Sequence, residues 1–226
     1  MTDDDPCRGP MRATWTTLLV QQVLGIGCYL FFVLPYLGRH RGFRDLDRKR
    51  RYLFVSNHVS LLDTILLGGL FWSRQRIPLL VLGDANVWKA NWIRRTLSAR
   101  LGFLIERGRK TKARIGELES FGRSSESFDL LVFPEGTRGN GRRVRRCQSG
   151  IYFAARASSL SMVPVFIEKM QQVSSKRRPF RPIAGLLKIR LHFGEPIAPE
   201  EYRALHKEAM TEMVRQKIQA LVPLEP

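Results

Sequence analysis

Short apolar runs alternate with longer segments of helical periodicity through most of the chain after residue 51. The apolar runs predict strands at residues 52–56, 79–82, 103–105, 130–133, 163–167 and 187–193. The segments between them predict helices at residues 61–71, 88–99, 111–121 and 150–158. Strands that are covered on both faces appear as near-continuous apolar runs. The pattern therefore predicts an α/β fold with a mixed, mostly parallel sheet flanked by helices.

A last helix should begin near Pro199, because proline suits a first helical turn and the acidic side chains of Glu200 and Glu201 complement the helix dipole there. Its predicted buried face recurs at helical spacing, at Met210, Val214, Ile218 and Leu221.

The N-terminal part contains 26 consecutive uncharged residues, 13–38, long enough as a helix to enter a hydrocarbon layer. Pro35 removes a backbone donor and Gly25 and Gly27 loosen the middle, so we predict a bent, half-inserted helical hairpin rather than a simple transmembrane helix. The leader before this stretch is acidic, which fits a signal peptide poorly. Two glutamines within the stretch keep a buried core helix as the alternative.

Residues 39–51 follow directly and contain seven Lys or Arg against two Asp. Basic residues beside an apolar segment favour the cytoplasmic side of a membrane and attract anionic headgroups. A solvated run of charge that serves solubility is the alternative. We therefore divide the chain into a membrane-associated helical segment at 1–38, a basic linker at 39–51 and an α/β domain at 52–226, on the cytoplasmic face.

The 226 residues carry 38 Lys and Arg against 20 Asp and Glu, a formal charge of +18. Such an excess favours polyanionic partners: nucleic acid, anionic lipid surfaces, or phosphorylated or acidic substrates. The three cysteines, Cys7, Cys28 and Cys147, are far apart and form no CxxC pair. This spacing argues against a disulfide framework and a structural zinc site, and it favours a reducing compartment.

Candidate chemistry begins after the first predicted strand, where His58 and Asp63 stand in an H-x4-D spacing. Five residues of helix turn about 500°, so the two side chains would not share a helical face. We therefore expect His58 at or before the helix start, where Asp63 can accept a hydrogen bond from one ring nitrogen. A histidine oriented by a carboxylate is suited to general-base catalysis. A structural role for this lone pair is the alternative.

The segment FPEGTR, residues 133–138, leaves another predicted strand. Gly136 lets the backbone approach a ligand, and the planar guanidinium of Arg138 matches phosphate. A tight turn with a surface arginine is the alternative. Arg107 and Pro164 are also expected at strand ends, where an α/β sheet binds its ligands.

The motifs NHVSLLD (57–63), GFLIERG (102–108), FPEGTRG (133–139) and VPV (163–165) occur in one order over residues 50–195. In these motifs the chain resembles the 1-acylglycerol-3-phosphate O-acyltransferases and related glycerolipid acyltransferases. The resemblance implies acyl transfer from acyl-CoA or acyl-acyl carrier protein to a lysophospholipid hydroxyl, without a metal, another cofactor or an acyl-enzyme. It also implies an N-terminal helical element in one membrane leaflet.

Site residues follow from the resemblance by position. His58 would be the general base and Asp63 its partner, and Pro164 would shape the acyl-donor side. The acceptor's glycerol phosphate would bind to Arg107, Glu135, Gly136, Thr137 and Arg138.

One position departs from the family, which usually has a lysine where this chain has Gln148. One explanation is that a nearby arginine replaces the missing charge. The candidates are Arg142, Arg143, Arg145 and Arg146, of which we select Arg146, two residues before Gln148. The other explanation is that the acceptor differs from lysophosphatidic acid.

The first hypothesis is therefore conversion of lysophosphatidic acid to phosphatidic acid by a membrane-associated enzyme, and acylation of another lysolipid, such as lyso-ornithine lipid, is the second. A non-catalytic basic protein that binds an anionic membrane or nucleic acid is a rival from another class. Nucleic acid is disfavoured, because only Phe180 lies inside a basic loop.

Overall fold

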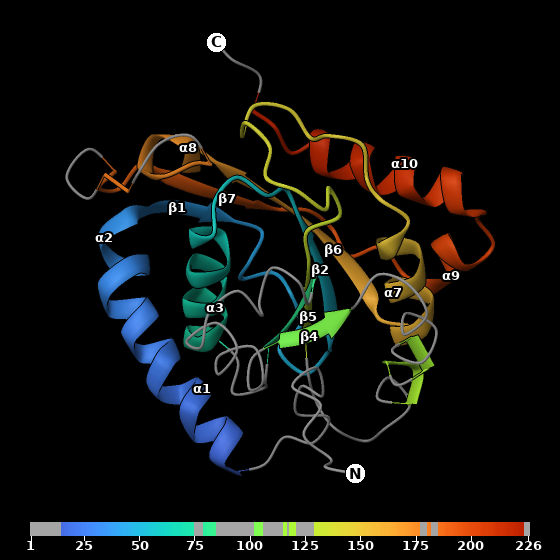
Figure 1. The fold of residues 1–226 in the computed structure, drawn as a ribbon, viewed down its shortest axis with the longest axis horizontal. Helices are drawn as coiled ribbons and strands as arrows, with labels where there is room; N and C mark the ends of the chain where they lie inside the picture. The colour runs from blue at the N-terminus through green and yellow to red at the C-terminus, as the bar shows by residue number, and fades with distance from the viewer. Residues whose placement is uncertain are drawn as a thin grey trace.

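A computed structural model describes residues 15–74, 79–84, 102–105, 115–116, 118–120, 129–176, 180–181 and 185–223. A seven-stranded sheet forms the centre of the molecule, in the order β1-β7-β6-β2-β5-β3-β4 (Figure 1). Its strands are β1 Leu37–Arg41, β2 Tyr52–Ser56, β3 Leu79–Asp84, β4 Gly102–Ile105, β5 Asp129–Val132, β6 Ser161–Glu168 and β7 Ile189–Phe193. Of the strand pairs, β6–β7 is antiparallel and the others are parallel. The predicted mixed, mostly parallel sheet is confirmed, and all six predicted strands are present.

Helices cover both faces of this sheet (Figure 1). One face packs against the π-helix η1 Tyr29–Val33, α2 Leu34–Tyr36 and α3 Leu62–Arg74, and α1 Trp15–Cys28 packs against α3. The other face packs against α7 Gly150–Ser158, α9 Pro199–Arg203 and α10 Lys207–Gln219, and the short helix α8 Met170–Val173 follows β6. The predicted helix at 88–99 lies outside the described residues, as does most of the one at 111–121.

The last helix is divided in two, which the sequence did not predict. It begins at Pro199 as expected, but α9 ends at Arg203 and His206 has extended dihedral angles, so α10 begins at Lys207. Met210, Val214 and Ile218 are buried as predicted, whereas Leu221 lies beyond α10 and packs against the core from the following turn.

The N-terminal segment forms one continuous helical run from Trp15 to Tyr36, so the predicted hairpin turn is absent from these residues. Val33 and Leu34 keep right-handed helical angles, and Pro35 lies in the first turn of α2, directly after the widened π-helical turn. Gly25 permits close packing of α1 on α3, because a Cβ there would overlap the Trp72 ring. The glycine therefore serves contact between helices rather than flexibility.

This helical run is both a core element and an exposed apolar surface. Its buried residues Phe32, Val33 and Tyr36 belong to the same core cluster as α3. Its exposed large apolar residues are Leu19, Val23, Ile26, Leu30, Phe31 and Leu34, which we call the apolar face. Among the described residues, no helix combines the length and the hydropathy needed to cross a membrane.

Residues 39–51, predicted to be a linker, take part in the fold. Most of β1 lies in this stretch and pairs with β7 at the edge of the sheet, and Phe43 and Leu46 are buried in the core. The correction has a simple cause: the segment is dominated by charge, and a strand at a sheet edge needs little apolar sequence of its own.

Pro164 does not end a strand, which corrects another prediction. It is the fourth of eight residues in β6 and pairs with Val55 of β2. Its carbonyl accepts a hydrogen bond from Gly194 N at 2.9 Å, and a Cβ on Gly194 would come within 2.8 Å of the proline ring. The ring is accommodated inside the sheet because residue 194 has no side chain.

The candidate site lies where β2 and β5 end. These two strands are parallel neighbours, with Val55 opposite Val132, so the segments that follow them leave the sheet side by side. His58 and the FPEGTR segment are thereby brought to one edge of the sheet, although 75 residues separate His58 from Phe133.

Candidate active site

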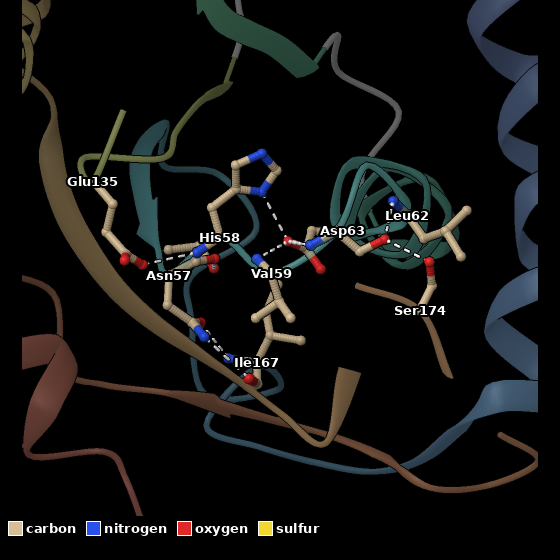
Figure 2. Close-up of polar contacts among 10 residues, drawn as sticks. Asn57, His58, Val59, Leu62, Asp63, Glu135, Ile167 and Ser174 are labelled. Atoms are coloured by element: carbon tan, nitrogen blue, oxygen red, sulfur yellow. Dashed lines mark hydrogen bonds and ion pairs between the residues drawn. The ribbon is translucent and has the colours of Figure 1, made fainter. Parts of the chain in front are cut away.

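His58 and Asp63 form the hydrogen-bonded pair that their spacing predicted (Figure 2). His58 Nδ1 lies 2.8 Å from Asp63 Oδ2, and His58 precedes α3, whose first turn carries Asp63. Because a carboxylate oxygen can only accept, the ring donates from Nδ1 and keeps a lone pair on Nε2. Within the described part of the chain, Nε2 has no hydrogen-bond partner. The ring is therefore arranged to accept a proton at Nε2.

Asp63 also shapes the loop that presents the histidine. It is fully buried, and its Oδ2 accepts hydrogen bonds from Val59 N at 2.6 Å and Ser60 N at 2.9 Å. The same carboxylate oxygen thus holds the ring of His58 and the backbone of the two residues after it.

Phe133 fixes the plane of the imidazole. The two rings are stacked, with centroids 4.2 Å apart and an interplanar angle of 23°. Sequence reasoning did not assign Phe133 this role. Its place directly before the PEGTR residues was the available signal, since that segment was expected beside His58.

Asn57 is a second residue that sequence reasoning missed. Its side chain is buried and forms two hydrogen bonds with the backbone of Ile167 in β6: Nδ2 donates to O at 3.1 Å, and Oδ1 accepts from N at 2.7 Å. The amide continues the β2–β6 pairing beyond the end of β2 and so fixes the residue before His58 (Figure 2).

The FPEGTR segment forms a turn beside the histidine. Gly136 has φ +64°, in the left-handed region that favours glycine, and its N–H donates to Phe133 O at 3.1 Å. Gly136 and Thr137 are exposed and Arg138 is half-buried, so these three residues remain candidates for binding an acceptor.

Gln148 lies directly against this turn. Its backbone N–H donates to Pro134 O at 2.7 Å, and its Cγ would be 3.0 Å from a Cβ placed on Gly136. The position at which the chain departs from the resembled family therefore borders the candidate acceptor turn. Arg146 is exposed two residues earlier.

Glu135, predicted to help hold the acceptor, is buried. Its relative exposure is 2%, and its Oε1 and Oε2 accept hydrogen bonds from His58 N at 3.0 Å and Arg145 N at 3.2 Å. Burial raises the pKa of the Glu135 carboxyl, and these two hydrogen bonds oppose the rise. The carboxylate is thus occupied by backbone donors inside the protein.

Two further predicted site residues, Arg107 and Pro164, stay predictions. Arg107 lies outside the described residues. Pro164 is buried in β6, and its predicted influence on the acyl-donor side stays a prediction. No group of three His, Cys, Asp or Glu side chains in the described segments could hold a metal ion.

Comparisons with known proteins show the family to which the chain belongs. The family model described as Acyltransferase matches residues 39–168. The chain is similar to a lyso-ornithine lipid O-acyltransferase of Pseudomonas aeruginosa, with 34% identity over 137 residues. That alignment covers 57% of this chain and 47% of the Pseudomonas protein, so the chain spans about half the length of this relative.

Two further similarities extend over more of the chain. A lyso-ornithine lipid O-acyltransferase of Rhizobium meliloti is 23% identical over 205 residues, which cover 79% of this chain and 67% of that protein. The crystal structure of the 1-acyl-sn-glycerophosphate (LPA) acyltransferase PlsC from Thermotoga maritima superposes with a TM-score of 0.63 at 18% identity. The superposition covers 91% of this chain and 78% of the Thermotoga chain, which shows that the two folds are similar.

Proposed function

The chain belongs to the acyltransferase family, and from that premise we propose that it transfers a fatty acyl group from a thioester donor to the hydroxyl of a lysolipid. The observation that carries this proposal is the His58–Asp63 pair, with Nε2 of His58 unpartnered among the described residues and the FPEGTR turn beside it. A non-catalytic basic binding protein would need neither feature, so family and geometry favour an enzyme.

The proposed reaction is a direct transfer. His58 Nε2 removes the proton of the acceptor hydroxyl, and the oxygen attacks the thioester carbonyl. The tetrahedral intermediate expels the thiolate, which takes the proton from His58, and the products are an ester and a free thiol. Asp63 keeps the proton on Nδ1 and stabilises the charged ring. The donor is acyl-CoA or acyl-acyl carrier protein, and we propose no bound cofactor.

The acceptor is the finer part of the proposal. Lyso-ornithine lipid is favoured by the similarity to two lyso-ornithine lipid O-acyltransferases and by Gln148, an uncharged residue whose side-chain carbons lie against Gly136. An ornithine headgroup carries a carboxylate and an ammonium, so it needs less positive charge than a phosphate monoester. Lysophosphatidic acid is the second candidate, supported by the exposed Arg146 and half-buried Arg138.

We also propose that the apolar face lies in a lipid leaflet. Leu19, Val23, Ile26, Leu30 and Leu34 recur at intervals of three and four residues, which places them along one side of the helical run. An apolar stripe on a surface helix next to basic residues is typical of interfacial helices. Both lysolipid acceptors are dissolved in such a leaflet, and the basic residues that follow favour its cytoplasmic side.

Transfer of a labelled acyl group by the purified protein in mixed micelles tests this function. Lyso-ornithine lipid and lysophosphatidic acid would each be supplied with palmitoyl-CoA and with palmitoyl-acyl carrier protein. We expect an ester product with at least one acceptor, formed about 10²- to 10⁴-fold more slowly by His58→Ala. No product from any combination, with the protein folded, would refute the proposed function.

A further inference from the structure

The peptide groups of His58 are held from two directions by the FPEGTRG segment. Glu135 Oε1 accepts the hydrogen bond of His58 N at 3.0 Å, and Gly139 N donates to His58 O at 2.6 Å. We call these two hydrogen bonds the His58 clamp. On the His58 side, the donor and the acceptor are both backbone atoms, so the clamp acts on the position of the residue and not on its ring chemistry. Figure 2 shows the hydrogen bond between Glu135 and His58.

We propose that Glu135 and Gly139 are positioning residues that fix the backbone of His58 for proton transfer, and that Glu135 is not a ligand of the acceptor. This inference rests on the proposed function, in which His58 is the general base. The carboxylate of Glu135 is 2% exposed and both of its oxygens are engaged. Its second hydrogen bond, from Arg145 N, joins the arginine-rich loop to the same carboxylate.

Gly139 has a steric reason to be glycine. A Cβ at this position would lie 2.8 Å from Glu135 Oε2 and 3.5 Å from His58 O. An alanine would therefore push against the carboxylate that completes the clamp. The glycine and the glutamate form one unit, and disturbing either should displace His58 in the same way.

Three other residues also hold the histidine, but they act on its ring or on the residue before it. Asp63 and Phe133 orient the ring, and Asn57 fixes the preceding residue against β6. The clamp is what fixes the His58 backbone against the turn that is the candidate acceptor site. Because a 1 Å misplacement of a reacting group can cost about 10² in rate, this distance between base and acceptor should matter.

Glu135→Gln is the direct test. A carboxamide has one accepting oxygen, so only one of the two backbone N–H groups keeps its partner. We expect kcat to fall roughly 10- to 100-fold. The KM values of acceptor and donor should stay within about twofold of wild type, because in this proposal Glu135 contacts neither substrate and only the placement of the base for proton transfer is disturbed.

A matched control exists at the start of β5, the strand that leads into the FPEGTRG segment. Asp129 is a buried carboxylate whose Oδ1 accepts a hydrogen bond from Tyr52 N of β2 at 2.7 Å. Asp129→Asn removes a buried charge on β5 without changing either residue of the clamp. We expect kcat and both KM values of this variant to match wild type, whatever happens to its thermal stability.

Gly139→Ala keeps the carboxylate and so provides a second test that does not depend on the folding of Glu135→Gln. It should lower kcat in the same direction with unchanged KM. In the double variant the loss should be smaller than the product of the two single losses, because both changes act on one contact.

Three results would overturn the inference. An acceptor KM that rises in Glu135→Gln at unchanged kcat would make the carboxylate an acceptor ligand. Wild-type kcat in folded Glu135→Gln or Gly139→Ala would make the clamp dispensable, and fully multiplicative losses would separate the two residues. His58→Ala distinguishes these failures from failure of the proposed function. Wild-type kcat in His58→Ala refutes the general base itself, whereas a strongly impaired His58→Ala beside a Glu135→Gln variant with wild-type kcat refutes only the clamp.

Discussion

At the scale of single residues, the loop after β2 concentrates its contacts on one carboxylate oxygen. Asp63 Oδ2 accepts from the His58 ring and from the backbone of Val59 and Ser60. Histidine and aspartate therefore contribute differently, because only His58 exchanges a proton with substrate in the proposed mechanism, whereas Asp63 supports both ring and loop.

His58→Ala should lower kcat by about 10²- to 10⁴-fold, the usual contribution of general-base catalysis, while the protein folds normally. Asp63→Asn should lose less turnover but destabilise the protein by about 1–3 kcal/mol, because it disturbs buried hydrogen bonds to backbone donors. Steady-state kinetics and thermal unfolding of both variants provide the measurements. A folded His58→Ala with wild-type turnover would remove histidine from the mechanism.

Gln148 and Arg146 should report the charge of the acceptor. If the acceptor is a phosphate monoester, Arg146→Ala should raise its KM by an amount equivalent to about 1.5–3 kcal/mol, the usual value of a hydrogen bond to a charged group. Gln148→Lys in that background should restore part of the loss, since charge-assisted hydrogen bonds are about twice as strong as neutral ones. The donor KM should barely change.

For a headgroup such as ornithine, the same two variants have a different expected outcome. Arg146→Ala should then be silent, and Gln148→Lys should newly confer activity on lysophosphatidic acid. Kinetics with lyso-ornithine lipid and lysophosphatidic acid for both single variants and the double variant distinguish the two acceptors.

The sequence was sufficient to predict the His58–Asp63 contact because only five residues separate the two and helix geometry limits their placement. Asn57, which reaches Ile167, and Glu135, which reaches His58, were missed or misassigned. Their partners lie 110 and 77 residues away in the chain, and no local pattern specifies such contacts.

At the scale of elements, apolar runs located the buried strands well, because a strand covered on both faces needs nearly continuous apolar sequence. β1 was missed, since it lies at the sheet edge and carries Arg39, His40 and Arg41. The division between α9 and α10 was also missed, because neither glycine nor proline marks residues 204–206.

Tyr202 should be important for the packing of α9. Its hydroxyl is buried and donates to Leu160 O at 2.8 Å, with Ala155 O 3.2 Å away, which joins α9 to the end of α7. Burial raises the pKa of Tyr202 to about 12, so the hydroxyl stays protonated as a donor at neutral pH. Tyr202→Phe should cost about 1–3 kcal/mol, because the buried carbonyls lose their partner.

Thermal unfolding measures this cost, at roughly 2–4 °C for each kcal/mol in a protein of this size. Tyr152→Phe is the matched control, because the Tyr152 hydroxyl accepts its hydrogen bond from Arg156 at the surface. That variant should unfold within about 0.5 kcal/mol of wild type. Equal destabilisation by the two substitutions would contradict the role assigned to the Tyr202 hydroxyl.

At the scale of the whole molecule, the apolar face and the net charge of +18 offer two ways of holding the protein on a membrane. They respond differently to salt: charge attraction is screened, whereas apolar burial is not. The structure also changes how the apolar face can be tested, because deletion of residues 1–38 would remove Phe32, Val33 and Tyr36 from the core. Substitutions at exposed positions avoid that damage.

Membrane association should survive both high salt and alkaline carbonate if the apolar face is inserted in a leaflet. Phe31 is 79% exposed on this face, and burying a phenylalanine side chain is worth about 1.5–3 kcal/mol. Phe31→Glu should therefore weaken binding to lipid vesicles by roughly 10- to 100-fold in a sedimentation assay. Phe153→Glu makes the same change in charge and size on α7, across the sheet from α1, and should bind as wild type does (Figure 1). Release of the wild-type protein by salt alone, with equal binding of the two variants, would instead assign membrane attachment to the basic surface.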